Sequence, residues 1–224
     1  MFAIDHAATA LLVKRRFPSV PMAPILISVQ AMELAWVALN CLGIERTTTE
    51  STVRSVADIH LAYMPYSHSI GTALVAALVA WLVIEKGFCR AALGRAVGLG
   101  IMSHLVLDLV THGHDIVLWP GLASPKLGLG LYEAAPFTAF IVEFLYGILC
   151  WRVYQGGRGL LALIVFGNLA NLSLLSAAIP GPEYYFAGRP LFVVAVIFVQ
   201  IVVTLMLVGV LARGLGRREL VVQT

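Results

Sequence analysis

The chain has 224 residues, 60% of them hydrophobic and 12% charged, and a mean hydropathy of +0.91. Soluble domains average about 45–50% apolar and about 25% charged residues, so this composition predicts an integral membrane protein. The formal net charge of +3 is small and the basic residues are scattered, which excludes a nucleic-acid-binding surface. We expect one integral-membrane domain over residues 1–224. Its N-terminal half (1–120) is expected to hold a metal site, and its C-terminal half (121–224) is expected to contain three helices.

The apolar segments predict an all-α bundle, because six of them approach the roughly 20 residues that a helix needs to cross the hydrocarbon core. They lie near residues 22–43, 64–85, 96–117, 134–152, 159–179 and 190–212. A shorter apolar segment, residues 2–16, precedes them, and two interpretations fit it. It is either a half-helix that carries Asp5 and His6 to mid-depth, or an amphipathic helix on the inner surface with both side chains solvated.

The basic residues predict the orientation of these helices. Eleven of the fifteen lysines and arginines flank the same ends of the predicted spans, and the positive-inside rule makes that side cytoplasmic. The expected topology is therefore six spans with both chain ends in the cytoplasm. The eleven residues are Lys14, Arg15, Arg16, Lys86, Arg90, Arg95, Arg152, Arg158, Arg213, Arg217 and Arg218.

The third predicted span carries the most informative group of side chains. His104, Asp108 and His112 follow one another at intervals of four residues, so a helix places them on one face. Ionisable groups inside an apolar span are costly, so they are expected to face the bundle interior and to mark a functional site. His112 lies one turn nearer the outer surface, where it either completes a metal site or lines its entrance.

Other spans also carry polar groups near their middles: Gln30, Glu33, Glu143, Asn168, Asn171 and Gln200. For the three residues Asn168, Asn171 and Gln200 we favour hydrogen bonds between helices. Glu33 and Asp108 need a compensating charge, and no lysine or arginine lies at their depth, so a bound metal is the simplest partner. Glu143 is a third ligand, a general base or a protonated packing residue, whereas His60 is expected to be a solvated loop residue.

The segment His104-Leu105-Val106-Leu107-Asp108-Leu109-Val110-Thr111, followed by Leu118-Trp119-Pro120, resembles a known signature. The family is the bacterial inner-membrane proteins called membrane-bound metal-dependent hydrolases, with their H-L-x-x-D-x-x-T … W-P motif. Ser67-His68-Ser69 resembles the T-H-S element of that family, and Asp5-His6-Ala7 its early T-H motif. The resemblance covers residues 1–120, and it implies the metal ligands His6, Glu33, His68, His104 and Asp108.

The chain also departs from the family pattern. The first long span reads Gln30-Ala31-Met32-Glu33 where the family has P-D-x-D, and Tyr63-Met64 stands where an H-R pair is usual. Glu33 replaces one of the two aspartates, and the other carboxylate is absent. We therefore expect an altered ligand set.

Together these features predict a zinc-dependent hydrolase of the bacterial inner membrane that acts on a lipid or lipid-linked ester or phosphoester. Its site is expected to face the outer side, with Glu143 or Asp5 as general base. Two other classes also fit: a proton- or ion-coupled transporter or channel with an Asp/Glu/His relay, and a membrane metallo-oxidoreductase. No inverted repeat is visible in the sequence, which disfavours a common transporter architecture.

Overall fold

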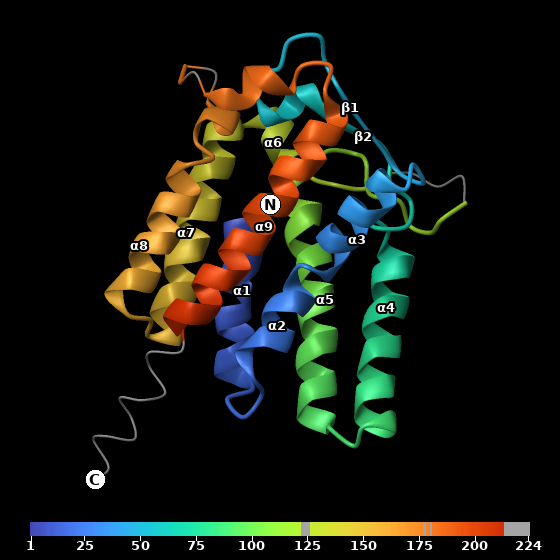
Figure 1. The fold of residues 1–224 in the computed structure, drawn as a ribbon, viewed down its shortest axis with the longest axis vertical. Coiled ribbons are helices and arrows are strands. Elements are labelled where there is room, and N and C mark those ends of the chain that lie inside the picture. The colour runs from blue at the N-terminus through green and yellow to red at the C-terminus, as the bar shows by residue number, and fades with distance from the viewer. Residues whose placement is uncertain (122–125, 177, 180, 213–224) are drawn as a thin grey trace.

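The computed structural model describes residues 1–121, 126–176, 178–179 and 181–212, which are mostly helical (Figure 1). Within these residues, four helices have the length and apolar composition to cross a membrane. The predicted all-α membrane bundle is therefore confirmed at this coarse level. The four are α4 (Ile70–Leu82) with its continuing turn η2 (Val83–Gly87), α5 (Ala91–Thr111), α7 (Pro136–Tyr154) and α9 (Pro190–Leu211).

The first and fifth predicted spans differ from regular transmembrane helices. The first is two helices, α2 (Met22–Val29) and α3 (Ala31–Cys41), bent by 55° at Gln30. The fifth contains α8 (Arg158–Leu169), whose 12 residues extend only about 18 Å at 1.5 Å per residue. The described part of the chain thus has four spanning helices, or five if the bent pair is one span, and six spans are not confirmed.

Helix α1 (Ala3–Arg16) lies inside the bundle, packed against α2, α5, α7, α8 and α9. Its residues Asp5 and His6 are only 0% and 2% exposed. Burial on this scale contradicts the alternative of a surface helix with solvated Asp5 and His6. Helix α1 contains four alanines, and small side chains let neighbouring backbones approach closely. This allows α1 to pack in the interior of the bundle.

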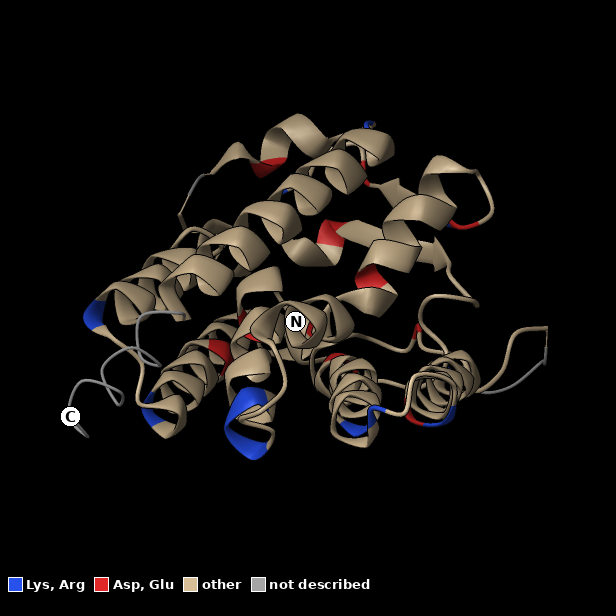
Figure 2. Cartoon of the chain, turned by 60° about the horizontal axis from the view of Figure 1, so that its bottom comes forward, with Lys and Arg blue, Asp and Glu red and all other residues tan. Residues whose placement is uncertain are grey.

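Short elements cover one end of the bundle, the upper end in Figure 1. Strands β1 (Arg46–Thr49) and β2 (Ile59–Tyr63) pair antiparallel there. The short helices η1 (Val56–Asp58), α6 (Leu131–Ala134), η3 (Ser173–Leu175) and η4 (Pro182–Phe186) lie nearby. Figure 2 shows lysines and arginines at the opposite end, where α1, α4 and α7 finish and α5 and α8 begin. Arg213, Arg217 and Arg218 lie outside the described residues.

Gly147 on α7 sets the distance between α1 and α7. A Cβ atom added there would lie 2.7 Å from Cγ2 of Ile164 and 2.9 Å from Oδ1 of Asp5. We predict that Gly147→Ala lowers the free energy of unfolding by about 1–3 kcal/mol, the usual cost of overpacking a filled core. Thermal unfolding in detergent measures this change. Gly209→Ala is the control, because its new methyl group would meet its nearest neighbour at an ordinary 3.4 Å; equal melting temperatures for the two variants would contradict the prediction.

Candidate metal centre

Four side chains from three parts of the chain meet at one point in the bundle: Glu33 from α3, His68 from the segment before α4, and His104 and Asp108 from α5. One ligand atom from each lies within 4.8 Å of the others. Three of these side chains are buried, and Glu33 is 20% exposed. We call this group the four-residue cluster. All four members were predicted metal ligands.

The spacing of the ligand atoms fits a small cation. Glu33 Oε2 lies 3.4 Å from His68 Nε2 and 3.6 Å from His104 Nε2. Asp108 Oδ2 lies 3.5 Å and 3.0 Å from the same two nitrogens. A tetrahedral site with metal–ligand bonds of about 2.0–2.1 Å has ligand atoms about 3.3 Å apart. The cluster could therefore hold a metal ion without a large rearrangement.

Three of these atoms are buried and have no hydrogen-bond partner: His68 Nε2, His104 Nε2 and Asp108 Oδ2. Asp108 Oδ2 lies close to both Nε2 atoms, but the angles at these contacts are not those of hydrogen bonds. Unsatisfied buried polar atoms are rare in proteins, and in an apolar interior each one costs several kcal/mol. A cation at their common point would be coordinated by all three, so this cluster fits a metal by chemistry as well as by spacing.

The bend between α2 and α3 orients His104. In a continuous helix the Val29 carbonyl would accept the amide hydrogen of residue 33. The break at Gln30 instead leaves that carbonyl 3.0 Å from Nδ1 of His104. An imidazole that donates Nδ1–H presents a lone pair at Nε2, which is the atom that faces the cluster. The irregular span therefore has a direct role in building the site.

Glu45 and Ser67 orient His68 in the same way from the other side. Ser67 Oγ lies 2.8 Å from Nδ1 of His68, and its hydroxyl donates to Oε2 of Glu45 at 2.5 Å. Glu45 Oε1 also accepts the backbone amide of Ser67 at 2.8 Å. Glu45 and Ser67 are both only 2% exposed. The sequence analysis missed Glu45, because it lies outside the predicted spans and has no spacing relation to the other site residues.

His6 and His112, the other two predicted ligands, lie beside the cluster. Their Nε2 atoms are 3.1 Å and 3.7 Å from Oδ1 of Asp108, the oxygen that faces away from the common point. The ring of His6 also stacks on the ring of His104, with centroids 4.0 Å apart. The α-amino group of Met1 donates to the same Oδ1 and to Thr111 Oγ1, each at 2.8 Å. The structure thus places these groups around Asp108 and outside the four-residue cluster.

The two candidate bases, Asp5 and Glu143, occupy a second buried site between α1 and α7. Glu143 accepts hydrogen bonds from Tyr132 Oη at 2.5 Å and from the Phe2 amide at 3.2 Å. Burial, and next the charge of Glu143, hold the pKa of the Tyr132 hydroxyl well above its ordinary value, so that hydroxyl keeps its proton. Asp5 accepts from Asn168 Nδ2 at 3.3 Å.

The other polar residues singled out in the sequence are placed as expected. Gln200 Nε2 donates to Asn171 Oδ1 at 2.9 Å, which joins α9 to the end of α8. Asn168 joins α8 to α1 through Asp5. The prediction of hydrogen bonds between helices is confirmed for Asn168, whereas the partner of Gln200, Asn171, lies in the turn just after α8. His60 is 48% exposed and pairs with the exposed Glu50 at 2.8 Å, so it is solvated as expected and is not a member of the four-residue cluster.

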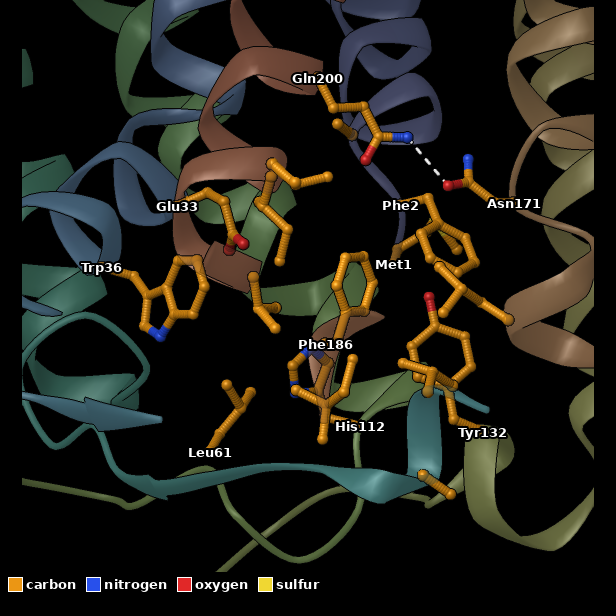
Figure 3. A pocket seen from close by; sticks show the side chains of 18 of the residues that line it. Met1, Phe2, Glu33, Trp36, Leu61, His112, Tyr132, Asn171, Phe186 and Gln200 are labelled. Atoms are coloured by element: carbon orange, nitrogen blue, oxygen red, sulfur yellow. Dashed lines mark hydrogen bonds between the residues drawn. The ribbon is translucent and has the colours of Figure 1, made fainter. Parts of the chain in front are cut away.

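A cavity of about 710 Å³ adjoins the four-residue cluster (Figure 3). Glu33 and His68 reach it directly, and His6, His112 and Tyr132 also line it. The described residues of its lining include neither Asp5 nor Glu143, although Tyr132 connects Glu143 to it. Much of the remaining wall is apolar and comes from Trp36, Leu61, Phe186 and the valines of α9.

Comparison of the chain with models of known protein families, with curated proteins and with solved structures found no match. The resemblance to the membrane-bound metal-dependent hydrolases therefore stays a prediction from sequence motifs.

We predict that Glu45→Gln weakens metal binding about 10–100-fold, the usual effect of removing a group that orients a metal-ligating histidine. The amide cannot accept both the Ser67 hydroxyl and its backbone amide as a carboxylate does, so His68 loses its fixed orientation. Competition with a chelator measures the affinity. Glu50→Gln is the matched control, since the exposed Glu50 pairs with the exposed His60 and not with a member of the four-residue cluster. An unchanged affinity in Glu45→Gln would show that His68 does not depend on this contact.

Proposed function

We propose that this protein is a membrane-embedded, metal-dependent hydrolase that acts on a lipid or lipid-linked ester or phosphoester. The observation that carries the proposal is the four-residue cluster, whose ligand-atom spacing and unpartnered atoms suit a divalent cation. The adjoining cavity supports it, because a hydrolytic site needs an open position beside the metal.

Zinc is the metal that we propose, because two imidazoles and two carboxylates are among its usual ligands. A cation here supplies Lewis-acid chemistry: it polarises an ester or phosphoryl oxygen and lowers the pKa of water to about 7. The open side of the cluster faces the cavity through Glu33 and His68. His6 and His112 hold the second oxygen of Asp108, so they fix the orientation of this carboxylate.

Hydrolysis adds water across the ester C–O or phosphoester P–O bond and yields an acid and an alcohol. In the proposed reaction Glu143 is the general base and works through Tyr132, which lines the cavity and donates a hydrogen bond from its hydroxyl to this carboxylate. The proton of the attacking water passes through this hydroxyl to Glu143 and returns to the leaving oxygen. Asp5, which lies on the far side of the same buried site, is the alternative base.

We also propose that the protein crosses the bacterial inner membrane six times, with the basic end of the bundle in the cytoplasm. Helix α7 ends at the basic end and α9 starts at the opposite end, so the chain between them must return across the bundle (Figure 1). Helix α8 and the turn η3 make this fifth crossing. The elements at the mouth of the cavity, β2, η1, α6 and η4, then face the outer side.

The metal content of the purified protein tests the proposed function. We predict about one zinc per chain, measured by elemental analysis. We also expect hydrolysis in vesicles of bacterial phospholipids, measured by the release of fatty acid or headgroup. The double variant His104→Ala/Asp108→Ala should lose both the metal and the activity, since it removes two of the four ligands. The variant Arg95→Ala/Glu85→Gln is the control, because it removes a cation–carboxylate pair, 3.7 Å apart, that lies outside the described lining of the cavity.

Other results would overturn the proposal. Stoichiometric zinc in His104→Ala/Asp108→Ala would show that the metal binds elsewhere. Iron instead of zinc would favour the oxidoreductase. A metal-free protein that takes up protons in an Asp108-dependent way would favour the transporter.

Accessibility in intact cells tests the topology. With Cys41 replaced by Ser and Cys89 by Gly, we predict that His114→Cys reacts with a membrane-impermeant thiol reagent and Arg90→Cys does not. His114 lines the cavity at its outer end, whereas Arg90 lies at the basic end between η2 and α5. Glycine suits position 89 because this residue has a φ of 55°. Labelling only at position 90 would reverse the orientation.

A further inference from the structure

The cavity reaches the surface of the bundle at two places of different character. At the outer end its lining includes exposed or partly exposed polar residues, among them His60, His114 and Lys126. At the other end, Gln200 and Asn171 lie opposite Leu61 (Figure 3). Here the walls come from the end of α8 and from one face of α9. We call this second place the lateral mouth, and its residues are Ala170, Asn171, Leu174, Val196, Val199, Gln200 and Val203.

Several of the side chains that line the lateral mouth are themselves exposed. Val199 and Val203 are 58% and 42% exposed, and both line the cavity. With Val196 they recur at three- or four-residue intervals, so they form one stripe along α9. Across the mouth Ala170 is exposed as well, at the point where α8 ends. Exposed side chains on both sides of this gap indicate that the cavity opens between these two elements.

The position of the lateral mouth decides what it opens to. Val199 lies nine residues after Pro190, about 14 Å along a helix that contains an 18-residue segment with a mean hydropathy of 3.0. This is close to half of a hydrocarbon core of about 30 Å. An opening at this depth meets lipid acyl chains, whereas the polar opening at the outer end meets water and headgroups.

We propose that the lateral mouth admits the acyl chain of a membrane lipid, which lies in the cavity with its ester or phosphoester group at the four-residue cluster. The proposal rests on the proposed function and names its substrate class: an amphiphile with at least one long acyl chain. The volume of about 710 Å³ is within the 300–1,000 Å³ or so of ligand pockets. The apolar wall suits the chain, and Glu33, His68 and His112 supply polar groups where the chain would join its headgroup. The mouth itself also carries two amides, Asn171 and Gln200, but these are hydrogen-bonded to each other.

Photo-crosslinking of the unmodified protein tests this route. The protein is reconstituted in phosphatidylcholine vesicles that contain a phosphatidylcholine with a diazirine in its acyl chain, and adducts are mapped by mass spectrometry. We expect adducts on Trp36, Phe186 or Val193, which line the cavity but are at most 8% exposed. Ile164 and Ile201 are equally buried and outside the described lining, so they should stay unlabelled. Bulk lipid alone would label only exposed residues such as Val210, and that result would overturn the proposal.

A pair of matched variants tests the mouth itself. Ala170→Phe/Val199→Phe places two large rings in the mouth, and we expect interior labelling to fall at least about tenfold, which corresponds to about 1.4 kcal/mol. Ala162→Phe/Val210→Phe makes the same changes on the same helices at exposed positions away from the cavity, and it should leave labelling unchanged. Equal interior labelling in the two variants would show that lipid enters elsewhere.

The metal-ligand variant separates this proposal from the proposed function. Because the chain is held by the apolar wall, His104→Ala/Asp108→Ala should keep interior labelling although it loses zinc and hydrolysis. If the unmodified protein shows interior labelling but binds no metal, the lateral mouth is supported and the proposed hydrolase function is overturned. If the unmodified protein binds zinc and hydrolyses lipid but shows no interior labelling, the hydrolase function is supported and the lateral mouth is overturned.

Discussion

The structure depends on the burial of a carboxylate, Asp108, at the centre of the bundle, where it is 1% exposed. An unpaired charge in an apolar interior costs many kcal/mol, so the surroundings must compensate for it. Four histidines and the α-amino group of Met1 approach its two oxygens within 4 Å. They come from α1 and the residues before it, from the segment before α4, from α5 and from its C-terminal end. This one charge therefore constrains how the N-terminal helix, the segment before α4 and the third predicted span pack together.

The irregular parts of the fold follow from the same constraint. A straight helix over 22–41 would keep the Val29 carbonyl in its own hydrogen-bond ladder, and His104 would lack the partner that fixes its orientation. The segment before α4 is likewise non-helical, which lets His68 reach the cluster while its Nδ1 contacts Ser67. Backbone outside regular helices is tolerated at membrane depth only where protein or a cavity surrounds it. Both segments meet that condition, since Gln30 and His68 line the cavity.

The sequence was sufficient to predict the centre of the site but not its surroundings. His104 and Asp108 could be found from the sequence. Their four-residue interval places them on one face of any helix. Ionisable groups are costly in an apolar span, so their presence there indicates a functional site. The same argument, applied to a carboxylate in the middle of the first long span, found Glu33, and the resemblance to the family motifs added His68. Glu45 could not be found, because its contact with Ser67 spans 22 residues and depends on how a loop folds back. The short α8 was also missed, since an apolar segment of spanning length does not show where its helix ends.

The buried position of α1 has a consequence for biogenesis. This helix is made first, yet it packs against α5, α7, α8 and α9, which are made later. It carries Lys14, Arg15 and Arg16 at one end and is too short to span the bilayer alone, so insertion machinery that recognises long apolar segments would pass it by. Its contacts with α9, the last described helix, can form only after α9 has entered the membrane. The N-terminal helix, which contributes His6 to the surroundings of Asp108, therefore completes its packing late in the assembly of the described bundle.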